Sequence, residues 1–210
     1  MAQACTPVVR PMRPDEADAV GALTLQAYDA HGSLTGPYRE RLADPGQRLE
    51  GASAVLVAEL DGRLAGTVTF VLPGDREWEH RREPAGDAGF RILAVAPWAE
   101  GRGVGRALVE ACLERARRAG AHRMVITSMA WMGRAHRLYE ARGFVYRPDL
   151  DVRFPSGLGH TYVLDLQPDA AVRFAPPGPP PPEPPWFEDV WIVSSASTVD
   201  RGRHDRDGPV

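Results

Sequence analysis

The chain has 210 residues, of which 43% are hydrophobic and 25% are charged, so it is long enough for one well-buried domain with additional segments. Its formal net charge of −3 gives no electrostatic reason to expect nucleic acid or an anionic membrane as a partner. With only Cys5 and Cys112, no secretory leader and no apolar run long enough to span a bilayer, we expect a soluble, cytoplasmic protein without a disulfide framework or a metal.

The first third of the chain is predicted to alternate short strands and helices. Residues 8–12 read as a strand, and Pro14, followed by two acidic residues, is typical of a helix start. This helix has one apolar face, formed by Val20, Leu23 and Ala27. A second short helix is expected over residues 37–42.

A β-hairpin is predicted next, from residues 54–60 and 64–72. The Asp61-Gly62 pair between them favours the turn type that matches the twist of two antiparallel strands. The charged segment 73–87 lacks periodicity and is interpreted as an exposed loop.

The second half of the domain is predicted to contain a strand-helix-strand unit and a further helix. The expected elements are a strand over 90–95, a helix over 103–119 that stops at Gly120, a strand over 123–127, a helix over 133–142, and strands over 144–146 and 160–166. A helical crossover makes the two strands that it joins parallel. The expected fold is α/β, with a mixed, mostly antiparallel central sheet flanked by helices and one parallel strand pair.

The composition changes beyond Leu166. We divide the chain into a domain over residues 1–166, a proline-rich spacer over 167–185, and an apolar segment with a disordered tail over 186–210. Eight of the residues 176–185 are proline, which favours an extended polyproline II spacer. Four large apolar residues follow, namely Trp186, Phe187, Trp191 and Ile192. We hypothesise that they dock on their own domain or on a second subunit, which leaves a homodimer open; an extension without a role is the alternative.

A glycine-rich segment between the predicted strand over 90–95 and the following helix is the strongest functional signal. Gly101, Gly103 and Gly105 allow backbone N–H groups to converge at the helix start, where a phosphate would satisfy unpaired amides and the positive end of the dipole. A P-loop is excluded because the chain has no lysine, and a dinucleotide fingerprint would need glycine where Arg106 or Leu108 stands.

Two motifs carry a resemblance to a known family. Residues 100–105, Glu-Gly-Arg-Gly-Val-Gly, resemble the acetyl-CoA loop of the GCN5-related N-acetyltransferase (GNAT) family, Gln/Arg-x-x-Gly-x-Gly/Ala. Residues 135–144, Ala-His-Arg-Leu-Tyr-Glu-Ala-Arg-Gly-Phe, are similar to its second signature, Ala-x-x-Leu/Phe-Tyr-x-x-x-Gly-Phe. The resemblance extends over residues 8–166 and implies the GNAT fold, with the parallel strand pair at the cofactor site.

The resemblance also implies a function. The expected activity is transfer of an acetyl group from acetyl-CoA, a co-substrate, to a primary amine by direct attack in a ternary complex. A small-molecule amine is the first expectation for the acceptor; a protein amine, or an acyl-CoA-binding module without turnover, is the alternative.

The implied site consists of one catalytic residue and a cofactor-binding set. Tyr139 matches the family's proton donor to the leaving thiolate, and the N–H of Val95 matches its donor to the thioester oxygen. The implied cofactor-binding residues are Leu93, Ala94, Val95, Gly101, Arg102, Gly103, Val104, Gly105, Arg106, Ala107 and Ala135.

The sequence departs from the family pattern at several points. Glu100 places a carboxylate near the pyrophosphate, which Arg102 and Arg106 could offset, and Met132 replaces an Asn. No carboxylate stands two or three residues before Arg91, so the general base stays open. The charged residues nearby are interpreted as solvated loop charges: Glu77, Glu79, His80, Glu83 and Asp87. Asp149 and Asp151 are rival bases, and a base acting through water is another alternative.

The remaining chemistry-bearing residues are interpreted as structural. Cys112 is expected to be an inert core thiol and His136 an exposed polar residue. Four aromatic or basic residues could line an acceptor pocket, although packing is the simpler interpretation: Tyr28, His31, Tyr38 and Trp78.

Overall fold

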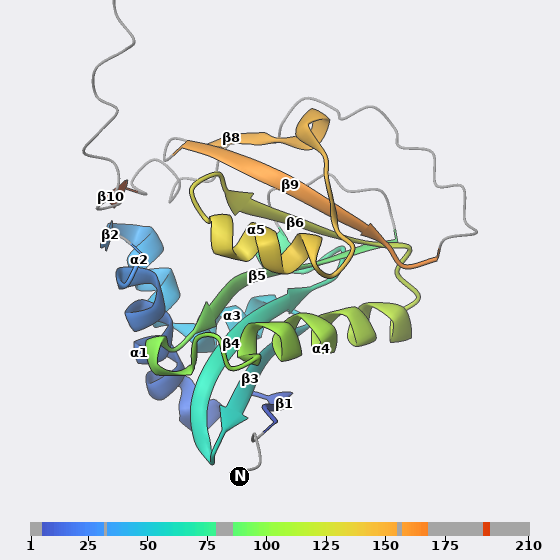
Figure 1. The fold of residues 1–210 in the computed structure, drawn as a ribbon. Coiled ribbons are helices and arrows are strands. Elements are labelled where there is room, and N and C mark those ends of the chain that lie inside the picture. Colours follow the sequence, from blue (N-terminus) through green and yellow to red (C-terminus); the bar gives the residue numbers. More distant parts are fainter. Residues whose placement is uncertain (1–5, 32, 79–85, 155–156, 168–190, 194–210) are drawn as a thin grey trace, which may run out of the picture.

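The computed structural model describes residues 6–31, 33–78, 86–154, 157–167 and 191–193. Its main sheet has the strand order β1-β3-β4-β5-β6-β9-β7, and β8 pairs with β9. Helices cover both faces of this sheet (Figure 1). All its pairings are antiparallel except that of β5 with β6, so the predicted α/β fold with a mixed, mostly antiparallel sheet is confirmed.

The N-terminal half of the sheet is built on the predicted hairpin. β3 (Ala54–Leu60) and β4 (Arg63–Val71) are joined by Asp61 and Gly62, both at positive φ (54° and 71°), as the Asp-Gly pair predicts. β1 (Val8–Pro11) pairs with the outer edge of β3.

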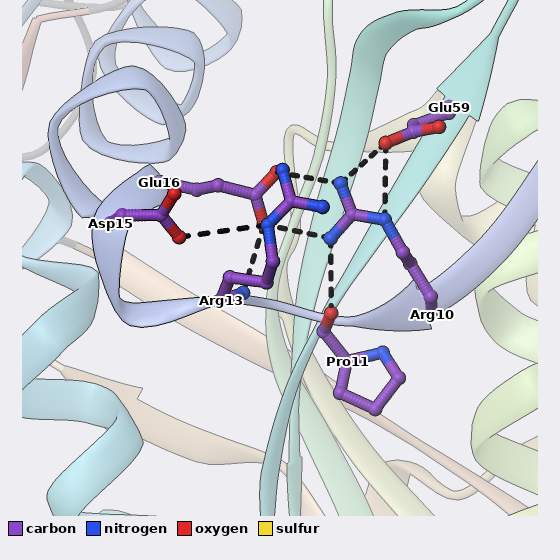
Figure 2. Close-up of polar contacts among 6 residues, drawn as sticks. All are labelled: Arg10, Pro11, Arg13, Asp15, Glu16 and Glu59. Carbon is purple, nitrogen blue, oxygen red and sulfur yellow. Dashed lines mark hydrogen bonds and ion pairs between the residues drawn. The ribbon is translucent and has the colours of Figure 1, made fainter.

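An ionic cluster attaches β1 to the rest of the sheet (Figure 2). The Arg10 guanidinium lies between the carboxylates of Glu59 on β3 and Glu16 on η1 (Pro14–Glu16), with Arg10 Nη1 to Glu16 Oε2 at 2.7 Å. Glu16 also accepts from Arg13 N–H at 2.8 Å. These hydrogen bonds, led by that of Arg10, lower the pKa of Glu16 to about 2.

One face of the sheet is covered by α1 (Ala17–Asp29), α2 (Pro37–Ala43) and α3 (Pro45–Gly51). Val20 on α1 packs against Val55 and Val57 of β3, as the predicted apolar face requires. α3 was not predicted. It begins at a proline, and the Asp44 carboxylate caps it by accepting from Gln47 N–H at 2.9 Å.

The opposite face is covered by α4 (Val104–Arg118) and α5 (Gly133–Glu140). α4 packs directly on Gly66 of β4, where a Cβ would lie 2.8 Å from Val104 Cγ1. Both helices are followed by glycines at positive φ, Gly120 (73°) and Gly143 (87°). The last part of the sheet consists of β6 (Arg123–Met129), β7 (Val145–Tyr146), β8 (Val152–Phe154) and β9 (Gly157–Asp165).

The parallel contact between β5 (Asp87–Val95) and β6 is short. It joins Asp87, Ala88 and Gly89 to residues 123–125 and does not extend further along β5. β5 also carries a bulge opposite β4, at which Ile92 adopts a φ of 52°, an uncommon conformation for a β-branched residue. The sheet therefore opens between the second half of β5 and β6.

The described part of the tail lies on its own domain. β10 (Trp191–Val193) pairs antiparallel with β2 (Ser33–Thr35), which directly precedes α2 (Figure 1). The hypothesis of docking in cis is therefore supported for residues 191–193, whereas Trp186, Phe187 and the predicted spacer lie outside the described residues. Over the described ranges, no helix has the length and apolar character that crossing a membrane requires.

Candidate active site

The glycine-rich segment connects β5 to α4 by way of η3 (Pro97–Ala99). Gly101 (φ 73°) and Gly103 (φ 83°) are left-handed, and the positions of their missing Cβ atoms face open space. No side chain caps α4, and Ala107 N–H donates to Gly103 O at 3.0 Å. The amides of residues 104–106 precede that bond, so they are the first-turn donors that an anion can satisfy.

A cavity of about 610 Å³ lies in front of this segment. Its walls come from α1, the end of β5, the glycine-rich segment and the start of α5. The residues that line it are Ala27, Tyr28, Ala30, His31, Leu93, Ala94, Val95, Ala99, Glu100, Gly101, Gly103, Val104, Gly105, Arg106, Trp131, Met132, Gly133, Arg134, Ala135 and Leu138.

The cavity brings together most of the residues that the resemblance implied for cofactor binding. The exceptions are Ala107, one residue further into α4, and Arg102. The Arg102 guanidinium instead pairs with Asp61 in the β3–β4 turn at 2.8 Å and lies 5.8 Å from the centre of the Trp98 ring. Arg102 thus reaches the hairpin turn, away from the cavity.

Glu100 is neutralised by residues other than the two arginines considered from the sequence. Its carboxylate pairs with Arg134 at the start of α5 and lies 3.5 Å from His31 Nε2 at the end of α1. It thus connects two opposite walls of the cavity. The sequence alone did not reveal these two contacts of Glu100, because Glu100, Arg134 and His31 lie on separate elements.

The end of β5 presents backbone groups to the opening in the sheet. Ala96 N–H donates to Ala65 O of β4 at 2.9 Å, and Val95 lies opposite Gly66 of the same strand. Because alternate N–H groups of a strand point to the same neighbour, the N–H of Val95 points away from β4. It is therefore directed toward the side on which β5 and β6 separate.

Tyr139 lies behind the cavity, in an aromatic cluster. Its ring contacts those of Phe90, Phe144 and Tyr162, each with ring centroids 5.8 Å apart. Burial raises the pKa of the Tyr139 hydroxyl above its usual value, so the group is protonated at neutral pH. Tyr139 is not among the residues that line the cavity.

Two carboxylates interpreted as solvated loop charges are in fact buried. Asp87 is 2% exposed and forms a bidentate pair with Arg123, with oxygen–nitrogen distances of 2.9 and 2.5 Å. Glu77 on η2 (Arg76–Trp78) is also 2% exposed and pairs with Arg41 at 2.5 Å. The exposed-loop interpretation was wrong for both, because their ion pairs let carboxylates enter the interior.

The rival bases are likewise engaged in hydrogen bonds. Asp149 pairs with Arg147 at 2.6 Å. Asp151 accepts from the Tyr146 hydroxyl at 2.7 Å and from Thr161 N–H at 2.9 Å. Glu79, His80 and Glu83 lie outside the described residues.

The other single-residue predictions have mixed outcomes. Cys112 is fully buried and burial raises the pKa of its thiol, which confirms an inert core residue. His136 is 8% exposed and stacks on His160 and Tyr162, so the prediction of an exposed residue was wrong. Burial, the larger effect, and His160 lower its pKa.

Of the aromatic and basic residues considered for an acceptor pocket, some line the cavity and others do not. Tyr28 and His31 line the cavity, whereas Tyr38 packs beside Leu42 and Ile92. Nothing is described for the side chain of Trp78. The structure adds Trp131 and Arg134, which carried no signal in the sequence beyond their nearness to the second signature.

Residues 20–144, more than half of the chain, match the acetyltransferase (GNAT) family. The chain belongs to the GNAT family. It is therefore an acetyltransferase. No curated protein matches the sequence itself. Within the described ranges, no group of three or more His, Cys, Asp or Glu side chains could hold a metal ion.

Solved structures with the same fold include three acetyltransferases. One is the yncA protein of Salmonella typhimurium with its cofactor acetyl-CoA, at 24% identity and a TM-score of 0.56, over 81% of this chain and 99% of that one. The second is a ribosomal-protein-alanine N-acetyltransferase of Brucella melitensis, at 21% identity and a TM-score of 0.58, over 75% and 99%. The third is an N-acetyltransferase of Staphylococcus aureus Mu50, at 20% identity and a TM-score of 0.56, over 77% and 99%. At these identities the likeness is one of fold.

Proposed function

We propose that this GNAT enzyme transfers the acetyl group of acetyl-CoA to the primary amine of a small molecule, by direct attack in a ternary complex. The observation that carries the proposal is the single cavity that joins the glycine-rich segment, the end of β5 and the α1 wall. A phosphate-binding segment and a possible acceptor wall thus face one another across the opening in the sheet.

The residues of the cavity fit acetyl-CoA. The first-turn amides of α4 and the open space at Gly101 and Gly103 suit a pyrophosphate. The backbone of Leu93 and Val95, on the open side of β5, suits the amide groups of the pantetheine arm as an additional strand would. Arg106 and Arg134 supply positive charge at the cavity wall.

When bound, acetyl-CoA supplies a thioester whose carbonyl carbon accepts the amine, so that a C–N bond forms and the C–S bond breaks. The N–H of Val95 is directed to stabilise the charge that develops on the carbonyl oxygen. Tyr139 is protonated at neutral pH, and we choose it as the donor of a proton to the departing sulfur on the family resemblance alone, because it lies behind the cavity lining. Cys112 is buried away from the cavity lining, which agrees with direct attack rather than an acyl-enzyme.

The proton of the incoming amine needs a separate acceptor. Asp87, Asp149 and Asp151 are engaged in the ion pairs and hydrogen bonds given above, and we assign the base to none of them. A water relay to bulk solvent through the open cavity is the route that we propose. Positioning of the two substrates then supplies the larger part of the rate enhancement, and proton transfer a factor of about 10²–10⁴.

A thiol-release assay tests the proposal. The protein is incubated with acetyl-CoA and a panel of small amines, and free CoA thiol and acetylated amine are both measured. We expect equimolar release of the two products with at least one amine. Tight acetyl-CoA binding without thiol release across the panel would instead support a binding module without turnover, and release with peptide amines alone would support a protein acceptor.

A matched pair of variants tests whether the glycine-rich segment binds acetyl-CoA. Gly105→Glu introduces a carboxylate where the new Cβ would lie 3.3 Å from Leu138, inside the cavity wall, and should abolish acetyl-CoA binding in calorimetric titration. Ala119→Glu adds the same charge at the exposed far end of α4 and should leave binding unchanged. Unchanged affinity in a folded Gly105→Glu protein would place the pyrophosphate elsewhere.

A further inference from the structure

Three arginines, one buried and two partly buried, lie behind the α1 wall of the cavity. We call them the arginine cluster: Arg41 on α2, Arg48 on α3 and Arg91 on β5. Glu77 pairs with two members of this cluster, Arg41 and Arg91. The cluster plays no part in the reaction steps given above.

Arg48 is the most unusual member, because it is completely buried and is bound to neutral groups. Its relative exposure is 0%. One guanidinium nitrogen donates to Thr69 Oγ1 at 3.1 Å and another approaches Leu42 O at 3.5 Å, while the buried Nε has no hydrogen-bond partner. A guanidinium without a hydrogen-bonded carboxylate is costly to bury, so a negative charge nearby would be favoured.

Arg91 lies beside Arg48 on the same face of the sheet. Arg91 is opposite Thr69 in the pairing of β4 with β5, and Thr69 is the residue that Arg48 contacts. The guanidinium of Arg91 donates to the backbone oxygen of Glu77 and lies 3.7 Å from Glu77 Oε2, which has no hydrogen-bond partner. The other carboxylate oxygen is bound to Arg41 at 2.5 Å. Glu77 is thus shared, and Arg48 receives no direct ion pair from it.

Tyr28 connects the arginine cluster to the cavity. Its side chain lines the cavity and packs with Tyr38 against Leu42 and Ile92. Arg48 reaches this packing group, since one of its guanidinium nitrogens approaches Leu42 O at 3.5 Å. Burial raises the pKa of the Tyr28 hydroxyl, and the positive charges of Arg48 and Arg91 act on it in the opposite direction. Tyr28 lines the cavity, and within the described residues its hydroxyl makes no hydrogen bond, so the O–H can donate to a ligand that reaches it.

We propose that the acceptor amine carries a carboxylate, held beside Tyr28 by the Tyr28 hydroxyl and by the positive potential of Arg48 and Arg91. This inference rests on the proposed function, because it names the class of amine that the same cavity receives. The phosphates of acetyl-CoA are not the negative charge that the arginine cluster would attract, because their proposed binding segment, residues 101–106, lies at the other side of the cavity. A free amino acid has the required chemistry, with an amine and a carboxylate separated by one carbon.

Three acceptors that differ little except in charge test the proposal: L-phenylalanine, L-phenylalanine amide and phenethylamine. Product formation is measured for each at saturating acetyl-CoA, with kcat and KM determined separately. Phenylalanine should have a kcat/KM at least about tenfold above those of the two amines that lack a carboxylate, mainly through a lower KM, as expected for a charge-assisted contact in a partly buried site. Equal or better use of the two amines without a carboxylate would overturn the proposal, whereas no product with any amine would count against the proposed function itself.

Two variants and a control locate the effect. Arg91→Gln and Tyr28→Phe should reduce the preference for phenylalanine over its amide by about tenfold and leave acetyl-CoA affinity, measured by calorimetry, within about twofold. Arg118→Gln removes an exposed charge from the far end of α4 and should alter neither quantity. If the cluster only holds α2, α3 and η2 on β5, Arg91→Gln will lower the melting temperature without changing the preference, and the proposal is wrong. Should Arg91→Gln fail to fold, Tyr28→Phe and the preference of the unmodified enzyme still decide.

Discussion

Glu100 sits at a loop position where the family pattern has Gln or Arg, and its effect depends on a neighbour from another element. Coulomb repulsion between its carboxylate and a pyrophosphate would oppose cofactor binding. The Arg134 guanidinium reduces that repulsion, and Arg134 is exposed enough to turn from Glu100 to a phosphate. We therefore expect Glu100 to compete with a bound cofactor for the Arg134 guanidinium.

Substitutions at Glu100 and Arg134 should change acetyl-CoA affinity in opposite directions. Glu100→Gln should bind equally well or up to about fivefold more tightly, because it removes repulsion and releases Arg134. Arg134→Gln should weaken binding by about three- to tenfold. Titration calorimetry at low and high salt measures both, and a Glu100→Gln protein that binds more weakly would give Glu100 a positive role in the site.

Tyr139 combines a packing role with the proposed proton transfer, and the two can be separated. Tyr139→Phe keeps the ring contacts with Phe90, Phe144 and Tyr162 and removes the O–H group. We expect kcat to fall by about 10²-fold, with acetyl-CoA affinity and melting temperature nearly unchanged. Full turnover by the variant would leave Tyr139 as a core aromatic residue.

At the residue scale, the roles of the glycines were more predictable from the sequence than the ion-pair partners of the charged side chains. Gly101 and Gly103 are required by backbone conformation, which a local motif encodes. Arg102, in the same motif, reaches Asp61 because the β3–β4 turn happens to lie beside the loop. Ion pairs such as this one, and the burial of Glu77 and Asp87, depend on contacts distant in sequence that no short pattern specifies.

At the scale of elements, the sequence predicted the long helices and strands and also the short β1, α2 and β7. It missed α3, β2, β8 and β10. α1, α4 and the β3–β4 hairpin follow from their apolar spacing and turn residues. α3 is short and contains two glycines, Gly46 and Gly51, which lower helix propensity, and its Asp44 cap was the available signal. β2 and β10 are three-residue strands whose pairing is set by tertiary contact.

The attachment of β1 should give the enzyme a measurable pH dependence of stability (Figure 2). The pKa of Glu16 is lowered from 4.5 to about 2 in the folded protein, so its contribution is complete above about pH 5 and is lost as the pH falls toward 2. Glu16→Gln should lower the free energy of unfolding at pH 7 by about 2 kcal/mol and by much less at pH 2. Urea titrations at the two pH values measure this difference. Equal losses at both would mean that the ion cluster does not stabilise β1.

At the scale of the whole molecule, the two motifs and the order of elements were sufficient to predict the fold and family. The proposed acceptor wall was predictable only in part, through Tyr28 and His31, because α1 and β5 contribute to the cavity from separate parts of the chain. A cofactor loop is one continuous segment, whereas an acceptor wall is assembled by the fold.

Removing the chain beyond Leu166 tests whether the tail belongs to the folded unit. Loss of β10 leaves β2 without its strand partner, directly after the cavity residue His31. We expect the melting temperature to fall by about 2–4 °C, as for a loss of about 1 kcal/mol, with an unchanged oligomeric state. Calorimetry and size-exclusion chromatography of both forms provide the comparison. Identical melting curves would indicate that the strand pair contributes nothing to stability.

The brief parallel contact between β5 and β6 has a consequence for the lifetime of the protein in a cell. Three residue pairs join the two parts of the sheet along that line, and beyond them we propose that the cofactor arm pairs with β5. A ligand present at a hundredfold excess over its Kd stabilises the folded state by about 2.7 kcal/mol. Resistance to proteases should therefore rise with acetyl-CoA concentration. A shortage of the metabolite would then reduce the amount of enzyme as well as its rate.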